Sequence, residues 1–210
     1  MAMKGRKGYD PKKRGSSNRK RKNIVLLATE GKNKTETKYF RDYGKAKSII
    51  IRFAPGDHTD PVNMISALIK QYNELELDPN CGDKAYCLID ADVNPDKTHQ
   101  IAEADKLASK NGIKLILSAP CFEIWYLCHF GCNGVHYQNN REVIDRLCKV
   151  LPGYKKSEDG MYKVLCEKTK EAVQNAKALE NSCMKAGYIP HTVHFSPSTE
   201  VYIIAEELGI

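Results

Sequence analysis

The stretch AYCLIDAD, residues 85–92, decides the fold class of this chain. Its first five residues are an apolar run of strand length without helical period, and two acids follow where the strand ends. Asp90 and Asp92 are two positions apart, so both side chains project on one face if the strand geometry continues. The stretch therefore predicts a buried strand that ends in a pair of carboxylates.

Similar apolar runs, separated by amphipathic segments, lie on both sides of this stretch. We expect further strands at 24–28, 48–53 and 113–117, with helices at 34–43, 64–76 and 97–110. Strand and helix alternate, which predicts an α/β fold with a TOPRIM-like, mainly parallel sheet flanked by helices. Beyond it we expect helices at 121–130, from 141, at 172–186 and at 200–208, the last capped by Ser198 or Thr199.

The positive charge of the chain is concentrated in residues 1–22. This arm has ten Lys or Arg and one Asp, a charge of +9, so the rest of the chain carries −2 of the total +7. With few apolar residues it is expected to be disordered and to contact nucleic acid, because neutralised phosphates release counterions. A solubilising extension is the alternative. The candidate contacts are Lys4, Arg6, Lys7, Arg19 and Arg21.

The rest of the chain is expected to form an α/β core over 23–135 and a helical extension over 136–210 packed on it. No apolar run reaches the roughly 20 residues of a membrane span, and no signal peptide is evident, so a cytoplasmic protein is expected. The eight cysteines are then reduced thiols. Zinc is disfavoured, because Cys121, Cys128 and Cys132 share a helical stripe with Trp125 and no C-x-x-C pair is present.

Acidic side chains follow two of the expected strands. Glu30 comes after 24–28, as Asp90 and Asp92 come after 85–89, and ligands of open parallel sheets gather at the carboxyl ends of the strands. Neighbouring carboxylates need a cation between them, and Mg²⁺, or Mn²⁺ in its place, takes oxygen ligands. The alternatives are a solvated turn for the aspartates and a helix N-terminal charge for Glu30.

Five more residues are candidates at the same edge. Gly31 allows close approach of a phosphate, Lys32 and Lys34 could neutralise charge on it, and His58 could contact it or shuttle a proton. Glu123, after the fourth expected strand, could complete the cation shell or orient a water. The competing interpretations are solvated lysines, an ordinary loop histidine and a helix-start charge for Glu123.

Together these motifs resemble a known family. A glutamate after the first strand and Asp-x-Asp after the third resemble the signature of the TOPRIM domain of topoisomerases, primases and related nucleases. More closely, the chain is similar to the RloB family of abortive-infection systems. The resemblance covers about residues 23–208 and rests on TEGK (29–32) with Thr35-Glu36 and Tyr39-Phe40, GDHTDP (56–61), DAD (90–92), PCFEIW (120–125) with His129-Phe130, PGYKK (152–156), and PST (197–199) with Val201-Tyr202. Ser196 stands where members typically have Asn.

The resemblance implies a TOPRIM core with helical additions, a role in phage defence and a partner ATPase. One hypothesis is a nuclease in which Mg²⁺ held by Glu30, Asp90 and Asp92 serves phosphodiester cleavage. Nucleotidyl transfer is a close variant. The other hypothesis is a non-catalytic subunit that binds nucleic acid or a nucleotide. The sequence is compatible with an oligomer and does not name the substrate.

Overall fold

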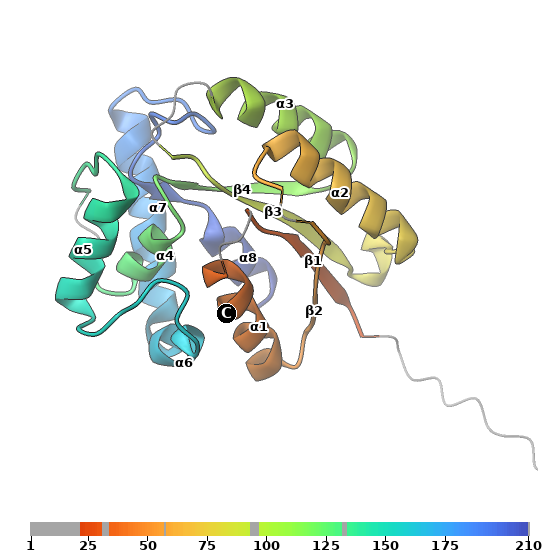
Figure 1. The fold of residues 1–210 in the computed structure, drawn as a ribbon, viewed down its shortest axis with the longest axis horizontal. Coiled ribbons are helices and arrows are strands. Elements are labelled where there is room, and N and C mark those ends of the chain that lie inside the picture. The colour runs from red at the N-terminus through yellow and green to blue at the C-terminus, as the bar shows by residue number, and fades with distance from the viewer. Residues whose placement is uncertain (1–21, 31–33, 57, 93–96, 132–133, 210) are drawn as a thin grey trace, which may run out of the picture.

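A mainly parallel sheet forms the centre of the molecule (Figure 1). The computed structural model describes residues 22–30, 34–56, 58–92, 97–131 and 134–209. Within these ranges the sheet has five strands in the order β2-β1-β3-β4-β5, of which only β5 is antiparallel to its neighbour. The strands are β1 (Ile24–Ala28), β2 (Ile50–Phe53), β3 (Lys84–Asp90), β4 (Lys114–Ala119) and β5 (Ser198–Thr199). The α/β class and the parallel core are thus as the sequence predicts.

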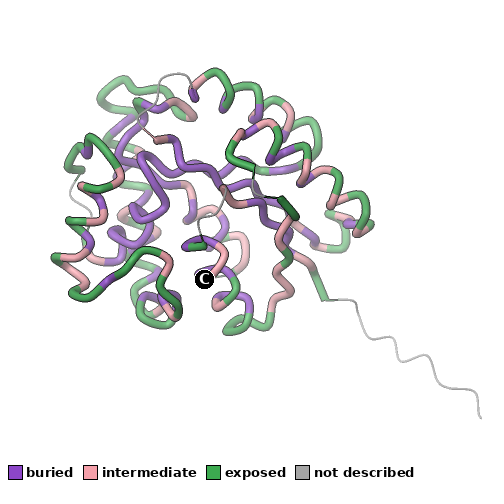
Figure 2. Tube along the Cα trace, viewed as in Figure 1, coloured by how far each residue is buried: buried purple, intermediate pink, exposed green. Residues whose placement is uncertain are grey.

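Helices cover both faces of the sheet (Figure 1). One face packs against α2 (Pro61–Glu74) and α3 (Lys97–Lys110). The other packs against α1 (Thr35–Lys47), α4 (Glu123–Cys128), α7 (Thr169–Lys185) and α8 (Val201–Glu207), while α5 (Asn140–Val150) packs on α4 and α6 (Met161–Leu165) packs on α1. Short 3-10 turns occur at Pro79–Cys81 and Cys166–Lys168. The central strands are buried on both faces (Figure 2), which is why they are continuous apolar runs in the sequence.

The segment expected to be a helical extension also contributes a strand. Ser198 and Thr199 pair with Ala119 and Ser118 of β4, so they form β5. Neither is the N-cap residue expected for α8, which is Glu200 without a side-chain cap bond, but Thr199 Oγ1 accepts a hydrogen bond from the backbone N–H of Val201 at 3.5 Å. Residues 136–209 are therefore continuous with the sheet and with the core that lies between the sheet and α1, α4 and α7. No helix in the described ranges is long and apolar enough to cross a membrane.

The predicted helical stripe of Cys121, Trp125 and Cys128 is buried, whereas Cys81 is exposed and Cys148 and Cys166 are half-buried. Cys121, Trp125 and Cys128 have no exposed surface. Cys132 lies outside the described residues. Tyr39 and Tyr43 are also buried, within a cluster of aromatic rings in edge-to-face contact. These side chains fill the interior between the sheet and its helices.

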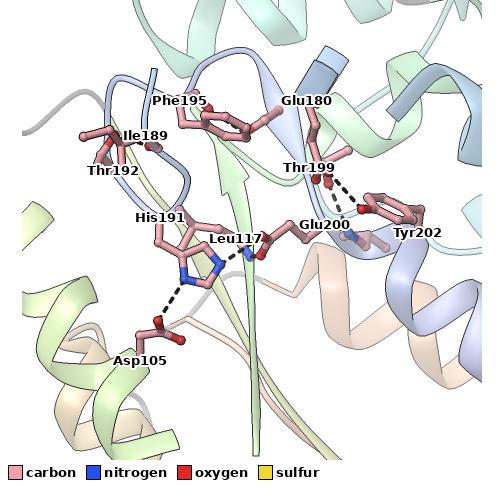
Figure 3. Close-up of polar contacts among 12 residues, drawn as sticks. Asp105, Leu117, Glu180, Ile189, His191, Thr192, Phe195, Thr199, Glu200 and Tyr202 are labelled. Atoms are coloured by element: carbon pink, nitrogen blue, oxygen red, sulfur yellow. Dashed lines mark hydrogen bonds and ion pairs between the residues drawn. The ribbon is translucent and has the colours of Figure 1, made fainter. Parts of the chain in front are cut away.

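A histidine links the segment before α8 to helix α3 (Figure 3). His191 Nε2 lies 2.9 Å from Glu200 Oε1, and its Nδ1 lies 3.3 Å from Asp105 Oδ2. Glu200 Oε2 in turn accepts a hydrogen bond from the backbone N–H of Leu117 in β4, at 2.8 Å. The hydrogen bond to Glu200 raises the pKa of His191 to about 9 against the effect of burial, with help from both acids. A charged imidazolium thus holds three elements together.

We expect His191→Gln to lower the free energy of unfolding by about 1–3 kcal/mol at pH 6. The pKa of this histidine is higher in the folded chain, about 9, than its ordinary value of 6.5. Its contribution is therefore full below about pH 6.5 and is lost as the pH rises through 9. Urea denaturation of both proteins from pH 6 to 9.5 measures this, since their difference isolates the histidine. A difference that stays constant across this range would contradict the assignment.

Candidate functional site

The three acids predicted to bind a metal come together at the carboxyl edge of the sheet. Glu30 lies two residues beyond β1, Asp90 ends β3, and Asp92 lies two residues further on. The strands β1 and β3 are neighbours. Glu30 Oε2 accepts a hydrogen bond from the backbone N–H of Asp90, with 3.3 Å between the heavy atoms. Parallel strand pairing therefore brings together residues that are sixty positions apart.

A lysine that sequence analysis did not identify lies between these acids. Lys97, the first residue of α3, is 8% exposed. Its Nζ donates to Glu30 Oε1 at 2.8 Å, to Asp92 Oδ2 at 2.9 Å and to the backbone oxygen of Asp90 at 2.7 Å. Burial lowers the pKa of Lys97, but the bonds and charges of Glu30 and Asp92 outweigh this and raise it. The lysine is a cation inside the acidic site.

Asp92 departs from the strand geometry that would put it on the same face as Asp90. Its φ is 44°, in the left-handed region that aspartate tolerates better than most residues. Its backbone N–H donates to the carbonyl of Pro120 at 3.1 Å, and its Oδ1 accepts from Asn140 Nδ2 at 2.9 Å. The local turn and the long-range amide contact therefore set the position of this carboxylate.

Two further acids lie deep beside Asp90. Glu36, in the first turn of α1, is 3% exposed, and Glu123, the first residue of α4, is 1% exposed. The Tyr154 hydroxyl donates to Glu123 Oε1 at 3.2 Å, whereas Glu36 Oε2 is buried and has no hydrogen-bond partner among the described residues. The site therefore contains more buried carboxylates than the two strand ends supply.

These acids raise one another's affinity for protons. Burial raises the pKa of Glu36 to about 8, and the charges of Glu123 and Glu30 add to the effect. Burial also raises the pKa of Asp90, followed in size by the charges of Glu36 and Glu123 and then of Glu30 and Asp92. A cluster of this kind favours the entry of positive charge, either as protons or as a metal ion.

Within the described part of the chain, no three His, Cys, Asp or Glu side chains are arranged as a ready set of metal ligands. Glu30 and Asp92 instead accept hydrogen bonds from the Lys97 ammonium, and Glu36 and Glu123 lie deeper, beside Asp90. Their chemistry still fits a hard divalent cation, because carboxylate oxygens are its preferred ligands and Glu36 Oε2 accepts no hydrogen bond from the residues that the structure describes. Glu30, Asp90 and Asp92 are the residues that could hold it, with Glu36 and Glu123 behind them.

The other predicted site residues are distributed differently. Lys34 is exposed at the start of α1. His58 is exposed and lines a depression of about 410 Å³ with residues of α2, and no hydrogen bond within the described residues joins it to the acids. The remaining predictions lie outside the described residues: Gly31, Lys32, Lys4, Arg6, Lys7, Arg19 and Arg21.

Four residues that contribute to the site were not predicted from the sequence: Glu36, Lys97, Asn140 and Tyr154. Glu36 could have been predicted, because it is an acid in the first turn of the helix that follows Glu30. Lys97 had a weaker signal, as the first residue of the helix after Asp92. Asn140 had none, and the PGYKK motif did not reveal the role of its Tyr154, since the contacts of these residues with Asp92 and Glu123 span 48 and 31 positions of the chain.

Comparisons with known proteins identify one family. The model of the RloB-like protein family matches residues 25–208. No curated protein matches the chain. Among solved structures, a de novo designed Rossmann fold protein shares 17% sequence identity, with 63% of this chain and 99% of the designed chain covered and a TM-score of 0.33.

Proposed function

This chain belongs to the RloB-like protein family, and from that premise we propose that it is a Mg²⁺-dependent nuclease of anti-phage defence that acts with a partner ATPase. The observation that carries the proposal is the meeting of Glu30, Asp90 and Asp92 at the carboxyl edge of a parallel sheet, where such folds bind their ligands. The defence role and the ATPase rest on the family resemblance alone.

The chain's own residues suit this chemistry. A divalent ion held here would polarise a phosphate and activate water. The buried carboxylates can give up their protons to a metal ion that enters the site, and the bond from Tyr154 fixes the orientation of Glu123. The hydrogen bond from Asn140 fixes one oxygen of Asp92 and directs the other inward. Preorganised groups of this kind favour phosphoryl chemistry because little rearrangement is needed during the reaction.

The direct test incubates the purified full chain with plasmid, single-stranded DNA and RNA. We expect cleavage of at least one substrate with Mg²⁺ or Mn²⁺ and none with EDTA. The same incubation with labelled nucleotides separates hydrolysis from nucleotidyl transfer, because only transfer incorporates label. Protein that binds the metal but leaves every substrate intact, with and without the ATPase of its defence locus, would refute the nuclease proposal.

A second candidate function, nucleic-acid binding without catalysis, is favoured by the surface next to the basic arm. Lys22, Arg41, Lys45 and Arg52 line a depression of about 380 Å³ between α1 and the outer strand β2. The described chain begins at Lys22, the last residue of the basic segment, which lines this depression. A polyanion could follow both basic regions, because each neutralised phosphate releases counterions.

We expect Arg41→Ala/Arg52→Ala to weaken binding of single-stranded nucleic acid and to flatten its salt dependence by about one to two units in the slope of log K against log salt. Fluorescence anisotropy from 50 to 300 mM salt measures both quantities. Arg141→Ala is the control, since that side chain is 90% exposed on α5, away from the depression. Equal slopes for wild type and the double variant would exclude this surface from the contact.

A further inference from the structure

Lys97 has the surroundings of an internal counter-ion. The ammonium makes three bonds of 2.7–2.9 Å, which use all three of its N–H donors, and the residue is 8% exposed. An exposed lysine would keep its charge in water. In Lys97 two carboxylates and a backbone carbonyl take the place of water around the ammonium, so its positive charge is balanced by the negative charges of Glu30 and Asp92.

The bonds of Lys97 use the oxygens that a metal ion would need. Glu30 and Asp92 each direct one oxygen at Lys97 Nζ and have the other engaged elsewhere, by the Asp90 N–H and by Asn140 Nδ2. Mg²⁺ requires its ligand oxygens at about 2.0–2.1 Å. An ammonium and a divalent ion sharing these oxygens would be a few ångströms apart and would repel each other strongly in a poorly hydrated site.

We propose that Lys97 is the site's resident cation in the metal-free protein, and that a divalent metal and the Lys97 ammonium compete for the carboxylates of Glu30 and Asp92. The inference rests on the proposed function, because it takes these two acids as metal ligands. Lys97 then acts as a positioning residue: it keeps the acids together before the metal arrives, and it sets the metal concentration at which the site fills.

The test compares Mn²⁺ binding to the full-length wild type and to Lys97→Met, which keeps the length of the side chain and removes its charge. Electron paramagnetic resonance of free Mn²⁺ gives the dissociation constant without any activity assay. We expect Lys97→Met to bind Mn²⁺ at least about 10-fold more tightly. We also expect its Tm to be below that of wild type in EDTA and to rise more than that of wild type when Mn²⁺ is added.

Two further variants keep the test decisive. Lys97→Gln retains hydrogen-bond donors without the charge, and it replaces Lys97→Met if circular dichroism shows that the methionine variant is unfolded. Lys106→Met is the matched control, because Lys106 is an exposed lysine of the same helix and should leave Mn²⁺ binding unchanged.

The outcomes separate this inference from the function on which it rests. If wild type binds Mn²⁺ and the charge-removing variants bind it equally or more weakly, the competition is refuted while the metal site stands. If none of the proteins binds Mn²⁺ at millimolar concentration, the metal site and the competition are both refuted. Tighter binding by the neutral variants, with Lys106→Met unchanged, supports the assignment.

Discussion

Asp90→Asn should lower metal-dependent cleavage by about 1000-fold or more without destabilising the fold. Asparagine has nearly the shape of aspartate but removes one negative charge, so it weakens the hold on a cation. In the metal-free protein burial raises the pKa of Asp90, followed by the charges of Glu36 and Glu123, so a neutral amide suits this position. The Tm of the metal-free variant should therefore equal or exceed that of wild type, whereas its activity falls.

Rates of plasmid or oligonucleotide cleavage and thermal melts in EDTA measure the two effects. Asp145→Asn is the matched control: it makes the same chemical change on α5, where the side chain is 65% exposed and lies 4.0 Å from Arg141. It should retain wild-type rates. Wild-type cleavage by Asp90→Asn would remove Asp90 from the chemistry, and a large drop in its Tm would indicate a structural role instead.

Trp125→Ala should lower the free energy of unfolding by about 3–5 kcal/mol. The single tryptophan of the chain is fully buried, and its Nε1 donates to the Tyr39 hydroxyl at 3.0 Å. Truncation leaves a large cavity between α1 and α4 and removes this bond. Trp125→Phe should cost less, about 1–2 kcal/mol, because most of the volume is retained while the hydrogen bond is lost.

Urea denaturation followed by circular dichroism is the appropriate measurement, since both variants lack the tryptophan fluorescence signal. Val164→Ala is the control, because Val164 is 58% exposed and its truncation should change stability by less than about 0.5 kcal/mol. A loss below 1 kcal/mol for Trp125→Ala would show that the α1–α4 interior contributes little to the stability of the fold.

The central strands could be predicted because burial on both faces requires apolar residues at consecutive positions, a pattern that is visible in the local sequence. β1, β3 and β4 are uninterrupted apolar runs between polar segments, and the helices between them fix the parallel direction. The acids at the strand ends could be predicted for the same reason, since a strand end is a local feature. The pattern at 85–92 also located Asp90, although the turn at Asp92 depends on contacts outside the strand.

What remained unpredicted depends on contacts between distant parts of the chain. Strand β5 has two residues and no apolar pattern, and it exists through its pairing with β4. Lys97 is one of 33 Lys and Arg residues, and only the packing of α3 beside the strand ends distinguishes it. The hydrogen bond from Tyr154 to Glu123 likewise requires the segment between α5 and α6 to pack beside the start of α4. Composition and periodicity carry no information about such partners.

The pairing of β5 with β4 has a consequence for how the chain reaches its native state. Ser118 and Thr199 are 81 positions apart, so β5 pairs with β4 only after the intervening segment, which contains α4 to α7, has been ordered. Contacts between residues so far apart in the sequence slow folding. Until then β4 exposes unpaired backbone that can template aggregation. A chain truncated before residue 198 should therefore aggregate during refolding under conditions in which the full chain stays monodisperse.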